Sequence, residues 1–317
     1  MSRRAPTPAA PAASAAATAL LLLLLCPLRA RAGGAWLPEP GHGEVQLGLS
    51  VKTAATSWSP RGEVRRHDSE HDFRYLYTGG EVGVSRRLSL SFLLLYLDGY
   101  EGPPGDQEHN AGFSEAFLGA KLRLRQGRWP MAIAFRLRTS YLYDLPGPYD
   151  RHLFGPDEDD LDGDVEEAVF RGVSPEWRGL LGEDYGVSFL ASRSLCGGGW
   201  VNLELGYNYR TTNLSDEIPL LLEVGHPLPW RDLVGKVAVR WVQSVGNESP
   251  GRDPEDRFGC SPRNCFPDAS VVVVGAGLFR DFGRDREWWV EAGFNQWVWG
   301  RSARRYQEPY LSIGRRF

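Results

Sequence analysis

Charged side chains recur at every second position inside several apolar segments of this chain. Alternate positions share one face of a β-strand. The set comprises Lys121, Arg123, Arg136, Arg138, Lys236, Arg240, Glu204, Glu223 and Glu291. A wall bearing such charges can select ions and charged solutes. The alternative is that the charges pair with one another and close the space between them, because buried charges must be compensated.

One histidine cluster has the residue types of a metal site. His67 and His71 are four positions apart, with three carboxylates close by in the sequence. On a helix these imidazoles would share a face and could bind zinc. The segment is predicted to be a loop entering a strand, where that geometric argument lapses, so we expect a solvated polar loop.

An acidic run is the densest charge cluster of the chain. Its acids follow the spacing of a calcium loop, with Gly163 among them: Glu158, Asp160, Asp162, Asp164 and Glu166. The bidentate acid that would close such a loop is missing, since Val169 stands there. We expect a solvated loop, and the alternative is weak Ca²⁺ or Mg²⁺ binding.

No catalytic constellation stands out. The chain has no Gly-x-Ser-x-Gly nucleophile elbow, and four of its six histidines lie in predicted loops. We therefore expect no enzymatic activity and no cofactor. An outer-membrane hydrolase is the less favoured alternative.

The elements that carry these charges are predicted to be β-strands, because apolar and polar residues alternate along them. The expected strands are 43–55, 70–84, 87–98, 111–125, 130–143, 184–195, 199–211, 216–227, 232–245, 269–281, 287–300 and 306–317. Residues 165–181 also look strand-like, and we assign them to an excursion or to an extension of the sixth strand. A 14-strand alternative stays open. The facing of 70–84 is ambiguous because Gly79 and Gly80 could host a bulge.

Two features favour one antiparallel transmembrane barrel of about 12 strands over a soluble sandwich. One strand face carries charges and small residues while the other is apolar, as in membrane barrels. Tight connections also alternate with long ones. The tight turns are 85–87, 126–130, 196–199, 227–232 and 283–286, and the long loops are 54–70, 98–111, 144–183 and 246–268.

The last strand supports the same class. Leu311, Ile313 and Phe317 fall on one face, which resembles the terminal strand of outer-membrane barrels, where a final aromatic residue is read by the barrel-assembly machinery. Arg315 departs from that pattern. Residues 202–209, Asn-Leu-Glu-Leu-Gly-Tyr-Asn-Tyr, precede a strand that ends in a Pro-rich turn. This part is similar to transporter-like barrels of the phenol-degradation MetA type, and the resemblance covers about a third of the chain.

The N-terminus is predicted to be a signal peptide over residues 1–32. Arg3 and Arg4 precede six leucines, and Ala30-Arg31-Ala32 offers small residues to a signal peptidase. The strong apolar core is too short to cross a bilayer core of about 30 Å, which argues against an anchor helix. Residues 33–317 would then form the barrel, placed in the bacterial outer membrane.

Net charge is −4 for the whole chain, and losing the four arginines of residues 1–32 would take it to about −8 by the same count. This balance argues against a nucleic-acid partner. In an oxidising compartment, Cys260 and Cys265 are predicted to form a loop disulfide. Cys196 is expected to be a free thiol.

These patterns predict a channel or transporter-like barrel for small solutes, with a preference for anions. A closed structural or interaction barrel without transport is the main alternative. The expected partners are outer-membrane lipid, lipopolysaccharide and the assembly machinery. The sequence specifies neither the solute nor the oligomeric state.

Overall fold

The computed structural model describes residues 34–58, 61–102, 108–140, 183–210, 216–230, 232–245, 270–301 and 303–317. Within these ranges the chain is all-β apart from one short 3-10 turn, Cys196–Gly198. The strands are β1 (Gly43–Trp58), β2 (Val64–Gly83), β3 (Leu88–Gly102), β4 (Glu108–Arg125), β5 (Met131–Ser140), β6 (Glu183–Ser194), β7 (Trp200–Arg210), β8 (Asp216–Pro227), β9 (Leu233–Val245), β10 (Ser270–Phe282), β11 (Trp288–Arg301), β12 (Ala303–Arg304) and β13 (Gln307–Arg316).

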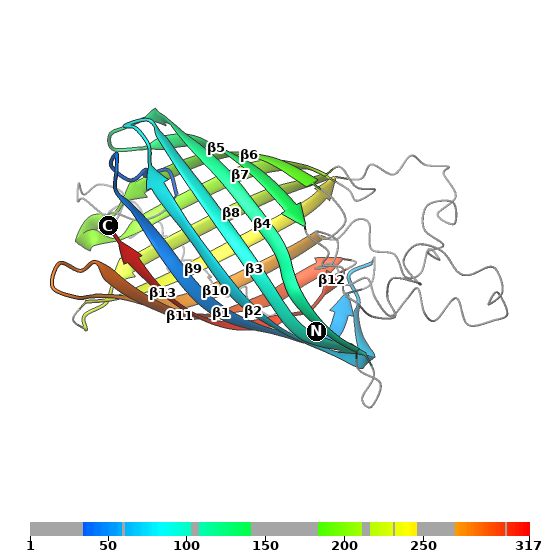
Figure 1. Ribbon diagram of the computed structural model, residues 1–317. Coiled ribbons are helices and arrows are strands. Elements are labelled where there is room, and N and C mark those ends of the chain that lie inside the picture. The colour runs from blue at the N-terminus through cyan, green and yellow to red at the C-terminus, as the bar shows by residue number, and fades with distance from the viewer. Residues whose placement is uncertain are drawn as a thin grey trace, which may run out of the picture.

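The sheet closes into a barrel of twelve strands (Figure 1). Each long strand pairs antiparallel with the next one along the chain, and β1 pairs with both β2 and β13. The two-residue β12 is an extra strand, which pairs with the end of β1. The antiparallel barrel of about 12 strands is therefore confirmed. The pairings leave no gap in the wall for a 14-strand barrel, since β5 pairs directly with β6.

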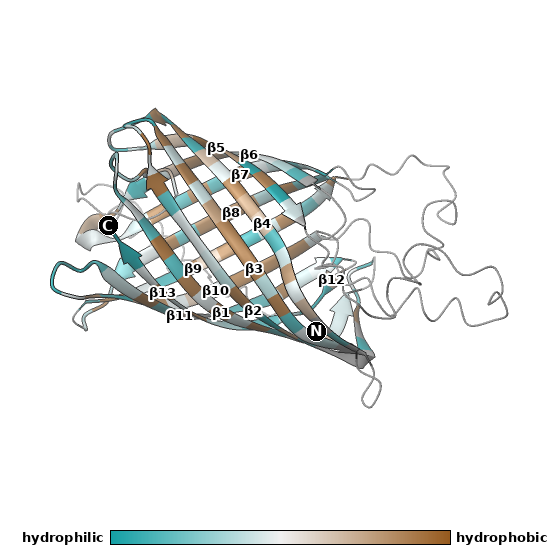
Figure 2. Cartoon of the chain, viewed as in Figure 1, coloured by the Kyte–Doolittle hydropathy of each residue, from teal (hydrophilic) through white to brown (hydrophobic). Residues whose placement is uncertain are grey.

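Alternation along the strands separates an apolar outer face from a mixed inner one. Outer residues such as Leu47, Leu118 and Phe135 keep 49%, 59% and 52% of their surface exposed. Figure 2 shows hydrophobic and hydrophilic residues recurring by turns along the strands. A monomeric water-soluble protein rarely exposes so large an apolar surface, whereas lipid covers it in a membrane barrel.

The tight turns lie at the end of the barrel that carries the C-terminus (Figure 1). In membrane barrels this is the periplasmic end. Several of these turns need a left-handed backbone, which glycine supplies at Gly127 (φ +125°) and Gly283 (φ +92°), for example.

The first hairpin extends further than the sequence predicts. β1 continues to Trp58 and β2 already begins at Val64, so the predicted loop 54–70 is wrong in its bounds. Residues 64–70 lack apolar alternation, which is the signal used for a membrane strand. A strand that continues beyond the bilayer needs no apolar outer face, so its backbone ladder can persist without that signal.

No helix in the described part of the chain has both the length and the apolar character needed to span a membrane. The predicted signal peptide, residues 1–32, lies outside the described residues. Its cleavage after Ala32 stays a prediction.

Candidate pore wall

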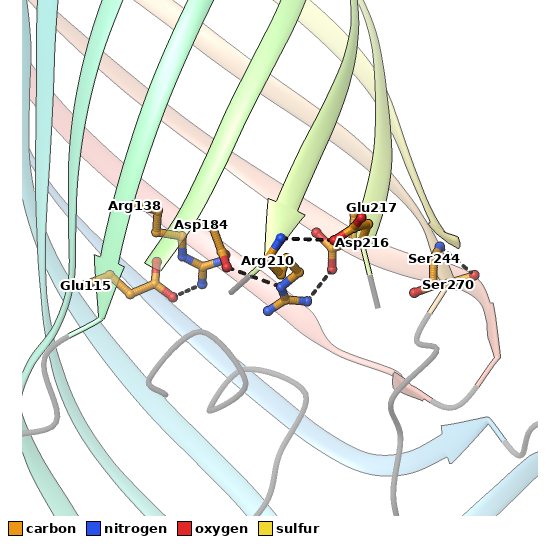
Figure 3. Close-up of polar contacts among 8 residues, drawn as sticks. All are labelled: Glu115, Arg138, Asp184, Arg210, Asp216, Glu217, Ser244 and Ser270. Carbon is orange, nitrogen blue, oxygen red and sulfur yellow. Dashed lines mark hydrogen bonds and ion pairs between the residues drawn. The ribbon is translucent and has the colours of Figure 1, made fainter. Parts of the chain in front are cut away.

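A row of alternating charges crosses five neighbouring strands near the end opposite the short turns (Figure 3). We call this row the rim ladder, and it consists of Glu115, Arg138, Asp184, Arg210 and Glu217. Arg138 contacts Glu115 and lies 3.3 Å from Asp184. Arg210 lies 3.4 Å from Asp184 and 2.8 Å from Glu217. Two guanidinium groups thus neutralise two of the three carboxylates.

Strand register explains how these groups meet. Arg138 on β5 faces Asp184 on β6, and Asp184 faces Arg210 on β7. Directly opposed residues of unlike charge stabilise a strand pair. The Arg210 side chain is only 5% exposed, and its backbone N–H donates to the Asp216 carboxylate at 3.0 Å. The rim ladder therefore links β4 to β8 by side chains as well as by the backbone ladder.

Other predicted wall charges are also paired. Arg136 lies 2.6 Å from Glu204, and Lys121 lies 2.9 Å from Glu81. Because Arg136 is on β5 and Glu204 is on β7, this pair reaches across β6. The positive charges of the predicted wall set are therefore largely neutralised.

Lys236 joins two more of the predicted carboxylates. Its Nζ lies 2.7 Å from Glu291 and 3.8 Å from Glu223. The Tyr310 hydroxyl donates to the same carboxylate oxygen that Lys236 contacts, Glu291 Oε1, at 2.7 Å. The Glu223 carboxylate in turn accepts from Asn202 at 2.9 Å. These contacts connect β7, β8, β9, β11 and β13 across one part of the inner wall.

Two predicted cations differ from the rest. Among the described residues, neither Arg123 nor Arg240 has a carboxylate at ion-pairing distance. The Arg123 guanidinium donates to the Leu37 carbonyl at 3.3 Å, and Arg240 is exposed. By alternation all nine predicted residues lie on the face opposite the exposed apolar side chains. That they line an open pore stays a prediction.

A short segment before β1 lies against the far inner wall. The Ala35 N–H donates to Ser192 on β6 at 2.8 Å. Ala35 and Leu37 pack with Ala132, Ala134 and Leu190 of β5 and β6. Because β1 adjoins β2 and β13, this segment must cross the lumen to reach them. It narrows the barrel near the end that carries the short turns, and the sequence does not predict it because no alternation marks it.

A buried aromatic cluster occupies another part of the wall. It comprises Ala54, Phe73, Tyr75, Leu97 and Tyr306, with Leu95 and Trp297 packed against it. Phe73 has no exposed surface and Tyr306 is only 2% exposed. The ammonium of Lys52 lies 4.6 Å from the centre of the Tyr75 ring, within cation–π range. The sequence left the facing of this part of β2 ambiguous, and the structure turns Phe73 and Tyr75 inward.

The remaining predicted sites have mixed outcomes. Cys196 is disulfide-bonded, so the expectation of a free thiol is wrong. Spacing along the chain could not reveal this, because a disulfide depends on distance in space.

Other predicted sites lie outside the described residues. They are Cys260 and Cys265, and the acidic run with Glu158, Asp160, Asp162, Asp164 and Glu166. Nothing is described of the side chains of residues 67–71 either, and the described residues contain no cluster that could hold a metal.

Phe317 sits beside the first strand. Its backbone exchanges two hydrogen bonds with Gly43, both of 3.0 Å, and its ring is exposed on the outer face. The last residue therefore helps to close the barrel seam between β13 and β1. Its role as an assembly signal stays a prediction.

Comparison with known proteins supports the fold. No family model matches the chain, and no curated protein matches it by sequence. The fold is similar to the COG4313 outer membrane channel from Pseudomonas putida F1, with a TM-score of 0.61 and 12% identity over 91% of this chain and all of that one. Weaker similarities include the translocator domain of the autotransporter NalP from Neisseria meningitidis (TM-score 0.43, 13% identity, 96% and 97% of the two chains). The KdgM porin is a further one (0.44, 5%, 86% and 98%).

The COG4313 neighbour is an outer membrane channel, and its fold agrees with the barrel class that the sequence predicts. At such low identity the likeness concerns the fold alone.

Proposed function

We propose that this protein is an outer-membrane channel for small solutes. The observation that carries the proposal is a closed twelve-strand wall with a lipid-compatible outer face and charged groups on its inner face. The segment at Ala35 and Leu37 narrows the lumen, which restricts passage to small molecules. Residues 1–32 would direct export, and lipid with lipopolysaccharide would surround the barrel.

We further propose a weak preference for anions. Most inner cations are held in ion pairs, so they contribute little net field along the lumen. Arg123 and Arg240 are the exceptions among the predicted cations. In a narrow passage, two guanidinium groups without a carboxylate partner attract passing anions more strongly than in bulk water.

Reversal potentials in a planar bilayer under a KCl gradient test both proposals. Wild-type protein should conduct with a modest preference for chloride, and Arg123→Ser with Arg240→Ser should abolish the preference. Arg284→Ser with Arg286→Ser is the charge-matched control at an exposed periplasmic turn, and should leave selectivity unchanged. Cation preference in the wild type would reject the second proposal.

Replacing a paired cation should shift selectivity in the same direction, because it exposes a carboxylate. Arg136→Ser leaves Glu204 without its partner, so selectivity should shift toward cations. An unchanged reversal potential would show that this pair does not face the ion path.

A closed barrel is the second candidate function, because ion pairs and the N-terminal segment both fill the lumen. Absence of conductance in a sample that still migrates as a folded barrel before boiling would support it and reject the channel. We expect no catalysis in either case.

A further inference from the structure

We propose that a belt of polar and aromatic side chains on the inner wall binds a short neutral oligosaccharide. The belt, which we call the polar belt, comprises Trp200, Asn202, Glu223, Lys236, Glu291 and Tyr310. These residues come from β7, β8, β9, β11 and β13, and only β10 intervenes in that part of the wall (Figure 1). The inference rests on the proposed channel, because it names the class of solute that occupies the lumen.

Strand register and side-chain contacts join the polar belt into one site. Trp200 is the register partner of Gly225, and Gly225 is that of Lys236. Directly opposed residues point to the same side of a sheet, so the indole and the ammonium share the inner face. The Lys236 ammonium lies 2.7 Å from Glu291, and the Tyr310 hydroxyl donates to the same carboxylate at 2.7 Å. The belt is therefore continuous from β7 to β13.

An aromatic ring lies flat on the wall at each end of the polar belt. Any side chain at Gly225 would collide with the Trp200 ring, and any side chain at Gly293 would collide with the Tyr310 ring. Each ring thus covers the backbone of a neighbouring strand with one face. Both residues are partly exposed, which leaves the other face toward the lumen. A planar apolar face of this kind can pack against the C–H face of a sugar ring.

Hydrogen-bonding capacity is unused between the two rings. Lys236 and Tyr310 both contact Oε1 of Glu291, and in the described part of the chain its Oε2 has no hydrogen-bond partner. Glu223 Oε1 accepts from the Trp200 indole N–H at 3.0 Å, whereas its Oε2 lies 3.8 Å from Lys236. A hydroxyl group can donate to such an oxygen and accept from an ammonium. A ligand with several hydroxyl groups is therefore suited to this stretch of wall.

The polar belt lies beside the segment that crosses the lumen. Ser192, which accepts from the Ala35 N–H, also donates to Oδ1 of Asn202 at 2.8 Å. The amide nitrogen of Asn202 is thereby turned to Glu223, which accepts from it at 2.9 Å. A solute that passes the segment at Ala35 therefore passes the belt.

The composition of the polar belt selects against other classes of solute. Its two carboxylates repel an anion, and Lys236 repels an ammonium ion. An aromatic hydrocarbon contacts the rings but gives the carboxylates no hydrogen bonds, whereas a neutral sugar supplies both kinds of contact. Gly225 and Gly293, beneath the two rings, lie three strands apart, about 14 Å along the wall. This spacing favours several linked sugar units over a single one.

Isothermal titration of the purified full-length protein with cellotriose and with maltotriose tests the inference, in a detergent that has no sugar headgroup. Trp200→Leu with Tyr310→Leu should weaken binding by about tenfold or more, because both stacking faces are lost. Tyr209→Leu with Trp241→Leu removes the same two ring types from the outer face, and should change binding less than about twofold. Gel mobility before boiling checks the folding of each variant.

A single position keeps the test decisive if the double variant misfolds. Trp200→Phe retains a planar ring, so it should bind at least about threefold more tightly than Trp200→Leu, which retains only apolar bulk. Equal binding by these two variants would overturn the inference.

Other probes separate the classes of solute. Tetramethylammonium, phenol and inorganic phosphate should each bind more weakly than the better of the two sugars, and tighter binding of any one of them would overturn the inference. Absence of binding by both sugars would also overturn it. Sugar binding without conductance would reject the channel and keep the site, whereas conductance without sugar binding would reject the site and keep the channel.

Discussion

The rim ladder and the aromatic cluster line different parts of the same barrel and are stabilised by different physics. The rim ladder spans β4 to β8, and its charges are partly hydrated and paired across strands. The aromatic cluster belongs mainly to β1, β2 and β3, and it excludes water around Phe73 and Tyr306. A lumen filled only with water would need neither. The inner wall is thus divided into a charge-compensated part and a packed apolar part.

This division predicts that truncating the packed part costs most. Phe73→Ala removes a fully buried ring and should lower the free energy of unfolding by about 3 to 5 kcal/mol, because transfer and cavity costs add. Urea titration of the folded protein in lipid vesicles measures it. Phe135→Ala, on the lipid-facing side of β5, should cost much less, since lipid fills the space. Equal losses would show that the aromatic cluster is not packed.

The rim ladder should be the next most sensitive region. Arg138→Met leaves Glu115 without its cation and Asp184 with only Arg210, so we expect a loss of about 2 kcal/mol. This value is below the cost of breaking a fully buried pair because the Arg138 side chain is 23% exposed. The same urea titration measures it.

A second substitution sharpens this test. Adding Glu115→Gln to Arg138→Met removes the uncompensated carboxylate and should recover about half of the loss. No recovery would mean that Arg138 acts through packing on Phe117, whose ring lies 5.5 Å from the guanidinium. Arg125→Met, at the exposed end of β4 beside a short turn, controls for the loss of a positive charge.

A single neutral donor should matter less than a guanidinium. Tyr310→Phe removes the hydroxyl that donates to Glu291, while Lys236 still compensates that carboxylate. The expected loss is about 1 kcal/mol, the usual net value of one hydrogen bond. Tyr209→Phe, on the outer face, is the matched control and should be nearly silent in the same titration. A loss above that of Arg138→Met would invert the proposed order.

The sequence predicts the strands far better than it predicts which inner-wall side chains contact one another. β8 matches its predicted bounds, 216–227, because alternation and the Pro-rich turn mark both ends. Alternation also assigns each wall residue to a face. It cannot give the pairing of Arg136 with Glu204, because that depends on the register of two strands separated by a third.

Alternation along the strands also could not predict contacts made by residues outside the strands. The segment at Ala35 and Leu37 carries no periodicity, and its position depends on a hydrogen bond to Ser192, 157 residues later in the chain. Likewise, Phe73 lies in a strand whose facing its sequence left ambiguous. The features that narrow the lumen arise from long-range packing, for which local patterns contain no signal.

The smallest effect is expected where the chemistry of the rim ladder recurs without burial. Arg286 and Asp232 join two of the short turns at 2.8 Å, with side chains 67% and 41% exposed. Water screens such pairs, and holding two long side chains costs entropy, so the coupling should be at most about 0.5 kcal/mol. A double-mutant cycle with Arg286→Gln and Asp232→Asn isolates this coupling, and asparagine tolerates the left-handed backbone at residue 232 (φ +61°).

Salt sharpens the comparison with the rim ladder. Raising NaCl from about 0.05 to 0.5 M should erase the coupling between Arg286 and Asp232, because salt shortens the range of charge interactions. The same cycle on Arg138 and Glu115 should keep most of its coupling at high salt. Equal salt sensitivity of the two pairs would show that the rim ladder is as hydrated as the exposed turn, and the division of the inner wall would then lose its physical basis.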